Sequence, residues 1–197
     1  MFARGFKTWC EKVALLQRRQ LDLRPTDPLG ARVLARHLGV DVHTVEEVPG
    51  LDPQCLRILC RNDADSWSAV TISGGSRDVV ILNPSHAPTR LASDLMHELA
   101  HILIGHNPAR IDVTEDGTLM LSTYNRQQED EANWLAGCLL LPRDALVLIR
   151  RQHLDFGTAA RTYGTSREML TYRMNVTGIE RQFTRAAIRY SQVARGV

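Results

Sequence analysis

His97, Glu98 and His101 are the residues with the clearest chemical potential, because they belong to the sequence His-Glu-Leu-Ala-His. On an α-helix, residues four apart are separated by about 6 Å along the axis and about 40° around it. The two imidazoles therefore leave the same helix face and can bind one tetrahedral Zn²⁺ ion. The spacing predicts a zinc site with one ion held by His97 and His101.

Glu98 lies between the two histidines, rotated by about 100° around the helix from His97. From there its carboxylate can reach a water molecule on the ion without being a ligand itself. Zinc lowers the pKa of such a water to about 7, and Glu98 can accept its proton and pass it to a leaving amine. The motif predicts peptide-bond hydrolysis with Glu98 as the catalytic base.

The third ligand must come from elsewhere in the chain. An extended motif on the same segment would need a glycine and a histidine where this chain has Ile104 and Asn107. His106 follows Gly105, a residue typical of helix ends, so His106 is predicted to be a loop or cap residue.

A second helical segment offers a better third ligand. Its stripe at spacing i, i+3, i+4 and i+7 consists of Glu129, Ala132, Asn133 and Ala136. The two alanines let this helix pack closely against the motif helix, which predicts Glu129 as the third ligand. Asn133, one turn further along, is the candidate for a residue that orients one of the metal ligands through a hydrogen bond. Glu131, about 200° around the helix from Glu129, remains the alternative carboxylate.

Hydrophobic spacing predicts the elements that position these residues. The motif helix is predicted over residues 90–104, with four apolar side chains on the face opposite the histidines: Leu91, Leu95, Leu99 and Ile102. Further helices are predicted over residues 6–21, 28–38, 126–141 and much of 143–190.

Strands are predicted over residues 40–48, 67–72 and 79–82. The last two are separated by Ser-Gly-Gly-Ser, which is typical of a hairpin. Helices that flank a small, mostly antiparallel sheet make a single α+β domain.

The composition is that of a globular protein, with 197 residues of which 44% are hydrophobic and 23% charged. These values exclude collagen-like, coiled-coil and largely disordered chains. The longest apolar run, residues 135–141, is far shorter than the roughly 18 to 20 residues that cross a membrane. The N-terminal residues carry no apolar stretch typical of a secretion signal. We therefore expect a cytoplasmic protein without membrane contact, whose four cysteines are reduced and mostly buried.

Charge is unevenly distributed along the chain. The net charge is +2, but residues 142–197 contain ten arginines and four acidic residues. We therefore expect a core with the catalytic motif and the N-terminal helices in residues 1–141, and a basic helical subdomain packed on it in residues 142–197. A basic segment of this kind permits contact with nucleic acid without requiring it.

Together, these motifs resemble those of the ImmA/IrrE family of zinc metallopeptidases over roughly residues 25–180. The resemblance rests on five segments in matching order and spacing: DPLGARVLARHLGVDV, ILNPSHAPTR, HELAHILIGH, EDEANWLAGCLLLP and TAARTYGTSREMLTYRMNVTGI. It implies a zincin-like fold in which His97, His101 and Glu129 bind one Zn²⁺ and Glu98 is the base. Members of this family typically cleave helix-turn-helix repressors and so derepress mobile-element or stress-response genes. A repressor is therefore the protein partner that the resemblance implies.

Two segments also resemble DNA-binding helix-turn-helix motifs. For residues 34–48 the alternation of valines favours a strand. Residues 159–174 match better, because Thr165-Ser166 can cap a following helix and three arginines, at positions 161, 167 and 173, add positive charge. An alternative function is therefore a DNA-binding regulator with a structural or regulatory metal site. A purely structural zinc site would need four protein ligands, whereas the sequence offers three.

Peptide hydrolysis also needs a donor that stabilises the developing oxyanion. The sequence offers four candidates and does not choose among them: Tyr124, His153, Tyr163 and Tyr172. The substrate is expected to bind as an added strand along the sheet edge beside the motif helix.

Overall fold

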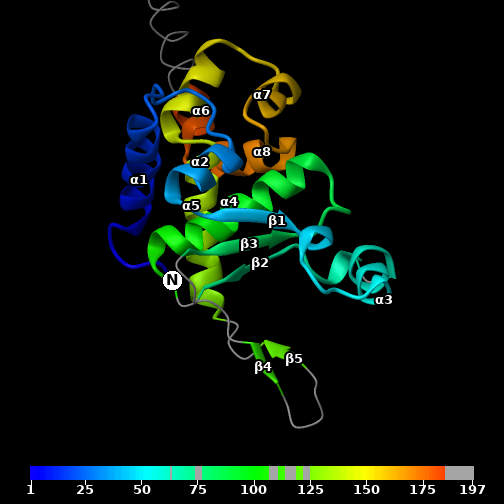
Figure 1. The fold of residues 1–197 in the computed structure, drawn as a ribbon. Helices are drawn as coiled ribbons and strands as arrows, with labels where there is room; N and C mark the ends of the chain where they lie inside the picture. The colour runs from blue at the N-terminus through cyan, green and yellow to red at the C-terminus, as the bar shows by residue number, and fades with distance from the viewer. Residues whose placement is uncertain (63, 74–76, 107–110, 114–118, 122–124, 185–197) are drawn as a thin grey trace, which may run out of the picture.

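The centre of the fold is a pair of long helices, α4 (Pro88–Ile104) and α5 (Arg126–Leu140), which pack against each other (Figure 1). The structure, a computed structural model, describes residues 1–62, 64–73, 77–106, 111–113, 119–121 and 125–184. Leu99 of α4 is fully buried, as is Ala132 of α5, and Ala136 is nearly so. Alanines at such positions let two helix axes approach closely, so that polar side chains on facing turns come within reach of one another.

Both ends of α4 follow from its sequence. Pro88 occupies the first turn, where its missing N–H group would have no partner within the helix. Gly105 follows the last helical residue with a φ of 78°, a left-handed conformation that glycine adopts without strain. The predicted motif helix is therefore confirmed and begins two residues earlier than expected. Leu95 and Leu99 face the core, whereas the histidines remain partly exposed.

A three-stranded sheet packs against α4, with the strand order β1-β3-β2 (Figure 1). Strand β2 (Ala69–Ile72) pairs antiparallel with β3 (Val79–Leu82), as the predicted hairpin requires. Its connecting residues 74–76 lie outside the described residues. Strand β1 (Asp41–Thr44) pairs with β3 in parallel, which the hydrophobic spacing did not indicate. Strand β2 is consequently an edge strand next to α4.

The remaining strand pair is formed by β4 (Ile111–Val113) and β5 (Leu119–Leu121), which run antiparallel. Two of the three strand pairs in the described part of the chain are thus antiparallel. The α+β fold with a small sheet is confirmed, but the three-stranded sheet itself is mixed, with one parallel and one antiparallel pair.

Helices α1 (Phe6–Gln20) and α2 (Ala31–Leu38) precede the sheet, and α2 stops at Gly39 as predicted. Helix α2 begins three residues later than the sequence indicated. Gly30, which directly precedes it, has an extended backbone with a φ of −72° and a ψ of 133°.

Strand β1 is shorter than the predicted strand over residues 40–48. Thr44 and Glu47 form a reciprocal capping box, which starts a turn of 3₁₀-helix directly after the strand. The sequence also gave no indication of helix α3 (Pro53–Arg57), which begins after the capping residue Asp52.

Helices α6 (Arg143–Arg151), α7 (Phe156–Thr162) and α8 (Arg167–Val176) follow α5, and residues 179–184 are helical again after a turn at residues 177–178. Within its described part the predicted helical region 143–190 is therefore broken three times, and its residues from 185 onward lie outside the described part. Asp155 caps α7, and Ser166 caps α8 as the sequence suggested.

Two buried arginines tie the neighbouring helices to the C-terminal end of α5. Arg18 donates from Nη2 to the carbonyl oxygen of Leu139 over 2.8 Å. Arg173 donates from Nε to the carbonyl oxygen of Leu141 and from Nη2 to Glu11, over 3.2 and 2.7 Å. The last carbonyl groups of a helix have no partner within it, and charged donors satisfy them here. Helix α5 is therefore anchored at the end opposite to Glu129.

All four cysteines are free, but only Cys10 and Cys138 are buried, whereas Cys55 is exposed and Cys60 half-buried. In the described part of the chain, no helix on its own has the length and apolar character needed to cross a membrane, although the bent pair of α5 and α6 passes that test together.

Candidate active site

Helices α4 and α5 bring together His97, His101 and Glu129, called the triad below. The Nε2 atoms of the two histidines lie 3.0 Å apart. Glu129 places one carboxylate oxygen 3.1 Å from Nε2 of His97 and the other 3.5 Å from Nε2 of His101. Within the described residues, the triad is the one group of His, Cys, Asp and Glu whose donor atoms converge enough to hold a metal ion.

These separations fit a tetrahedral ion. Zinc bound at about 2.0–2.1 Å holds two ligand atoms about 3.3 Å apart when the angle between them is tetrahedral. The three measured separations, 3.0, 3.1 and 3.5 Å, lie within a few tenths of an ångström of that value. Imidazole nitrogen and carboxylate oxygen are donors that zinc prefers. The triad therefore suits a zinc ion with three protein ligands.

The surroundings of His101 favour its neutral form, which is the form that binds a metal ion. Burial lowers its pKa to about 4, and the neighbouring His97 adds to that effect. The imidazole is therefore neutral at pH 7, and one of its two ring nitrogens has a lone pair to offer to a cation.

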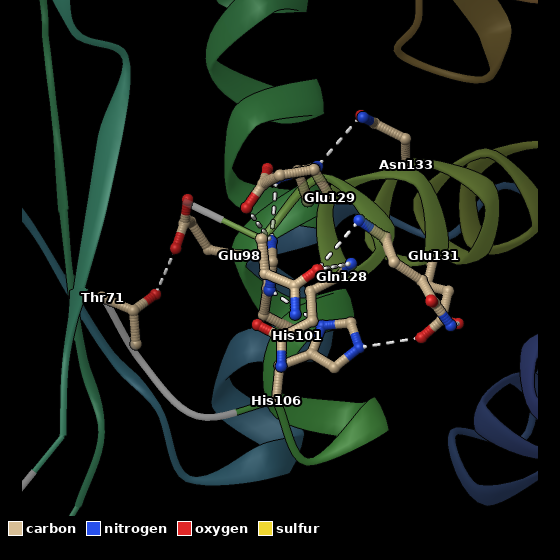
Figure 2. A network of polar contacts seen from close by, with 11 residues as sticks. Thr71, Glu98, His101, His106, Gln128, Glu129, Glu131 and Asn133 are labelled. Carbon is tan, nitrogen blue, oxygen red and sulfur yellow. Dashed lines mark hydrogen bonds and ion pairs between the residues drawn. The ribbon is translucent and has the colours of Figure 1, made fainter. Parts of the chain in front are cut away.

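Glu98 is not a member of the triad but lies beside it, with its carboxylate hydrogen-bonded to the sheet. Its carboxylate accepts a short hydrogen bond from the hydroxyl group of Thr71 on the edge strand β2 (Figure 2). Burial raises the pKa of Glu98, and the Thr71 hydrogen bond and His97 partly counteract that increase. The edge strand β2 and the motif helix α4 therefore meet through the hydrogen bond between Thr71 and Glu98.

The two rival carboxylates on α5 have different partners. Glu129 faces both Nε2 atoms of the histidines, whereas Glu131 lies 3.2 Å from Nε2 of His106. Asn133 lies one turn beyond Glu129, with its Oδ1 atom 3.1 Å from Nδ1 of His97 (Figure 2). The structure thus places Glu129 with the two histidines of the motif, and Asn133 next to the Nδ1 atom of His97.

His106 follows the end of α4, as its predicted role as a loop or cap residue requires, but its side chain is buried against His101. Sequence reasoning missed this contact. The sequence feature that could have indicated the contact is a histidine directly after a helix-ending glycine. A left-handed glycine folds the chain back over the last helical turn, so the next side chain can contact that turn.

The candidate oxyanion donors among the described residues differ in their exposure and partners. Tyr163 is buried, and its hydroxyl group donates to the carbonyl oxygen of Thr26 over 2.7 Å, so this donor is already engaged. His153 and Tyr172 are exposed on the surface. Tyr124 lies outside the described residues.

The segment 159–174 adopts two helices, α7 and α8, joined by four residues. Arg161 and Arg167 are exposed, but Arg173 is 1% exposed and bonded to Glu11. One of the three arginines that favoured DNA binding therefore supports the fold and is not available to a phosphate backbone.

Comparison with known proteins places the chain among peptidases. A sequence profile of the Peptidase M78 family, described as the IrrE N-terminal-like domain, matches residues 60–175, which include the triad and Glu98. Among solved structures, a Mycobacterium tuberculosis transcriptional regulator is similar with a TM-score of 0.51 and 17% sequence identity. The match covers 88% of this chain and 47% of that chain, so this chain spans about half of that protein's length. No match was found among curated proteins. The profile covers more than half of the chain, which therefore belongs to the Peptidase M78 family of IrrE N-terminal-like domains.

Proposed function

We propose that this protein is a zinc-dependent endopeptidase that cleaves a helix-turn-helix transcriptional repressor. The observation that carries the proposal is the convergence of His97, His101 and Glu129, with Glu98 held beside them by Thr71. Three protein ligands leave the fourth corner of a tetrahedral ion for water, as in catalytic zinc sites. Membership of a peptidase family supports the same chemistry.

His97, His101 and Glu129 would hold the zinc ion. When bound, zinc supplies Lewis-acid activation of a water molecule and of a peptide carbonyl group. The Glu98 carboxylate accepts a proton from the attacking water, while the oxygen of that water bonds to the carbonyl carbon. Glu98 then delivers the proton to the amide nitrogen, and the C–N bond breaks to give an amine and a carboxylic acid, which loses its proton to solvent at neutral pH. Burial raises the pKa of Glu98 and so helps it to hold the proton between these two steps.

An extended substrate would bind along strand β2. This strand is at the edge of the sheet, so one side of its backbone is not used by β3 and can pair with a peptide. Thr71 lies in the middle of β2 and contacts Glu98, so a peptide paired there would bring an amide bond next to the base.

The substrate class rests on the family resemblance, because such proteins typically cleave repressors. The similarity to a protein named a transcriptional regulator is compatible with a regulatory role. Since repressors act on DNA in the cytoplasm of bacteria, we propose the cytoplasm as the place of action.

Removal of the metal tests the proposal directly. The purified chain is incubated with helix-turn-helix repressors encoded next to its gene, in the presence of zinc or of a chelator, and fragments are identified by mass spectrometry. We expect one repressor to be cut at a defined bond with zinc, and no cleavage with the chelator, since without the metal nothing polarises the carbonyl group. Cleavage that persists at undiminished rate in excess chelator would contradict a metallopeptidase.

Substitution of Thr71 tests the link between sheet and base. Thr71→Val removes the hydroxyl group while keeping the shape, so Glu98 loses a hydrogen bond to its charged form, a type of bond that contributes about 1.5–3 kcal/mol. We expect kcat for repressor cleavage to fall about tenfold, with zinc content unchanged, because Thr71 does not contact the triad in this structure. Thr71→Ser keeps the hydroxyl group and is the control. Equal kcat values for the valine and serine variants would contradict the role of this bond.

A further inference from the structure

A row of polar side chains extends from His101, on the ring side away from the other two triad residues. The Nδ1 atom of His101 lies 2.9 Å from Nδ1 of His106, and Nε2 of His106 lies 3.2 Å from a carboxylate oxygen of Glu131. The other oxygen of Glu131 accepts a hydrogen bond of 3.0 Å from the amide group of Gln127. The side chains of His106 and Glu131 are only 7% and 15% exposed. Figure 2 shows His106 and Glu131 joined on the side of His101 away from Glu98.

The backbone holds His106 in this place. Gly105 adopts a left-handed φ of 78°, which turns the chain back over the last turn of α4. The backbone N–H group of His106 donates to the carbonyl oxygen of His101 over 3.0 Å. The ring of His106 is therefore tied to His101 by both its main chain and its side chain.

The distances determine where the hydrogens lie once His101 binds a metal through Nε2. A neutral imidazole has one N–H group, so the hydrogen of His101 is then on Nδ1 and is donated to Nδ1 of His106. His106 consequently carries its own hydrogen on Nε2, which faces the carboxylate of Glu131. Every donor in this row meets an acceptor, and the row ends on a negative charge.

The other ligand histidine has a simpler partner. Nδ1 of His97 faces Oδ1 of the exposed Asn133 over 3.1 Å. The two histidines are thus held from behind in different ways, one by a neutral exposed amide and one by a buried imidazole that is itself bonded to a carboxylate. Hydrogen bonds of this kind fix the ring orientation of a metal ligand and increase its basicity.

We propose that His106 and Glu131 are positioning residues that hold His101 in its metal-binding tautomer and orientation. The inference rests on the proposed zinc site but not on peptide hydrolysis. It assigns Glu131, the rival for the third ligand, to the support of His101 through His106. It also explains why a histidine stands directly after the glycine that ends α4.

The test compares zinc affinity in four full-length variants, measured by competition with a chromophoric chelator. His106→Leu removes both contacts of the ring, and we expect affinity to fall about 10- to 100-fold, the range found for partners behind metal ligands. His106→Asn places an amide oxygen near the position of Nδ1, which gives His101 the type of partner that His97 has, and should restore most of the affinity. Glu131→Gln keeps an acceptor but loses the charge, so a smaller loss than for His106→Leu is expected. Asp130→Asn, an exposed neighbour on the same helix, is the matched control without effect.

A second readout separates positioning from general destabilisation. Cobalt(II) bound in place of zinc has visible absorption bands that depend on ligand geometry, so His106→Leu should shift these bands and His106→Asn should restore them. Thermal unfolding of the metal-free variants reports any loss of stability independently. If His106→Leu does not fold, Glu131→Gln carries the test. Wild-type affinity and spectrum in the folded His106→Leu variant, or in Glu131→Gln when only that variant folds, would overturn the inference.

The outcomes also separate this inference from the proposed function. A protein that binds zinc but cuts no repressor would refute the peptidase proposal, while the affinities would still decide the role of His106. Cleavage by the wild type together with unchanged zinc affinity in the variants would refute the positioning role alone.

Discussion

Glu98→Gln is expected to leave zinc bound and to lower kcat for repressor cleavage by about 10²- to 10⁴-fold, the usual contribution of a general base. Glutamine has the shape of glutamate but cannot accept the proton of the attacking water at neutral pH. Metal content should be unchanged, because the Glu98 carboxylate contacts Thr71 and is not a member of the converging metal-donor group. Cleavage rate and the zinc-to-protein ratio are measured on the same preparation.

Asp130→Asn is the matched control, since it removes one exposed carboxylate from α5 without touching the triad. Its rate should equal that of the wild type. A Glu98→Gln protein that retained full zinc content and cleaved within about tenfold of the wild-type rate would show that another group takes the proton, because a general base normally contributes at least about 10²-fold.

Glu129→Ala is expected to lower zinc affinity by at least about 10²-fold. The binding free energy of about 10–16 kcal/mol for a four-ligand zinc site corresponds to about 3 kcal/mol per ligand, and 1.4 kcal/mol is a factor of ten. The variant should therefore be isolated with far less than one zinc ion per chain. Metal content by atomic emission and affinity by chelator competition provide the measurement.

Glu131→Ala is the comparison for this prediction, because it removes the rival carboxylate from the same helix. Glu131 contacts His106 and not the two histidine Nε2 atoms of the triad, so its removal should lower affinity only about tenfold and leave full occupancy at saturating zinc. If Glu131→Ala lost the metal and Glu129→Ala retained it, the ligand role would pass to Glu131.

The sequence was sufficient for the part of the site that depends on local geometry. His97, Glu98 and His101 lie on one helix, and the helical repeat alone places the two imidazoles on a common face. The same local rules predicted the end of α4 at Gly105 and the end of α2 at Gly39, because both glycines adopt the left-handed conformation that terminates a helix.

The partners of Glu129 and Glu131 needed the tertiary structure. Both are acidic residues in the early turns of α5, and the sequence favoured Glu129 as the one that faces the motif helix, with Glu131 as the alternative. The packing of α5 on α4 turns Glu129 toward the histidines and Glu131 toward His106. The alanine stripe gave the correct facing side, since alanine permits close approach, but it contained no information on the partner of Glu131.

The chain by itself therefore determined the fold class, the motif helix and the chemistry that its side chains can perform. Only the tertiary structure decided which distant groups meet that helix: Thr71 at Glu98, His106 behind His101, and β1 parallel to β3. It also placed Arg173, which its charge had suggested for DNA, inside the protein against Glu11. The physical reason is that helix periodicity and capping act over a few residues, whereas these contacts join segments whose proximity depends on how the whole core packs.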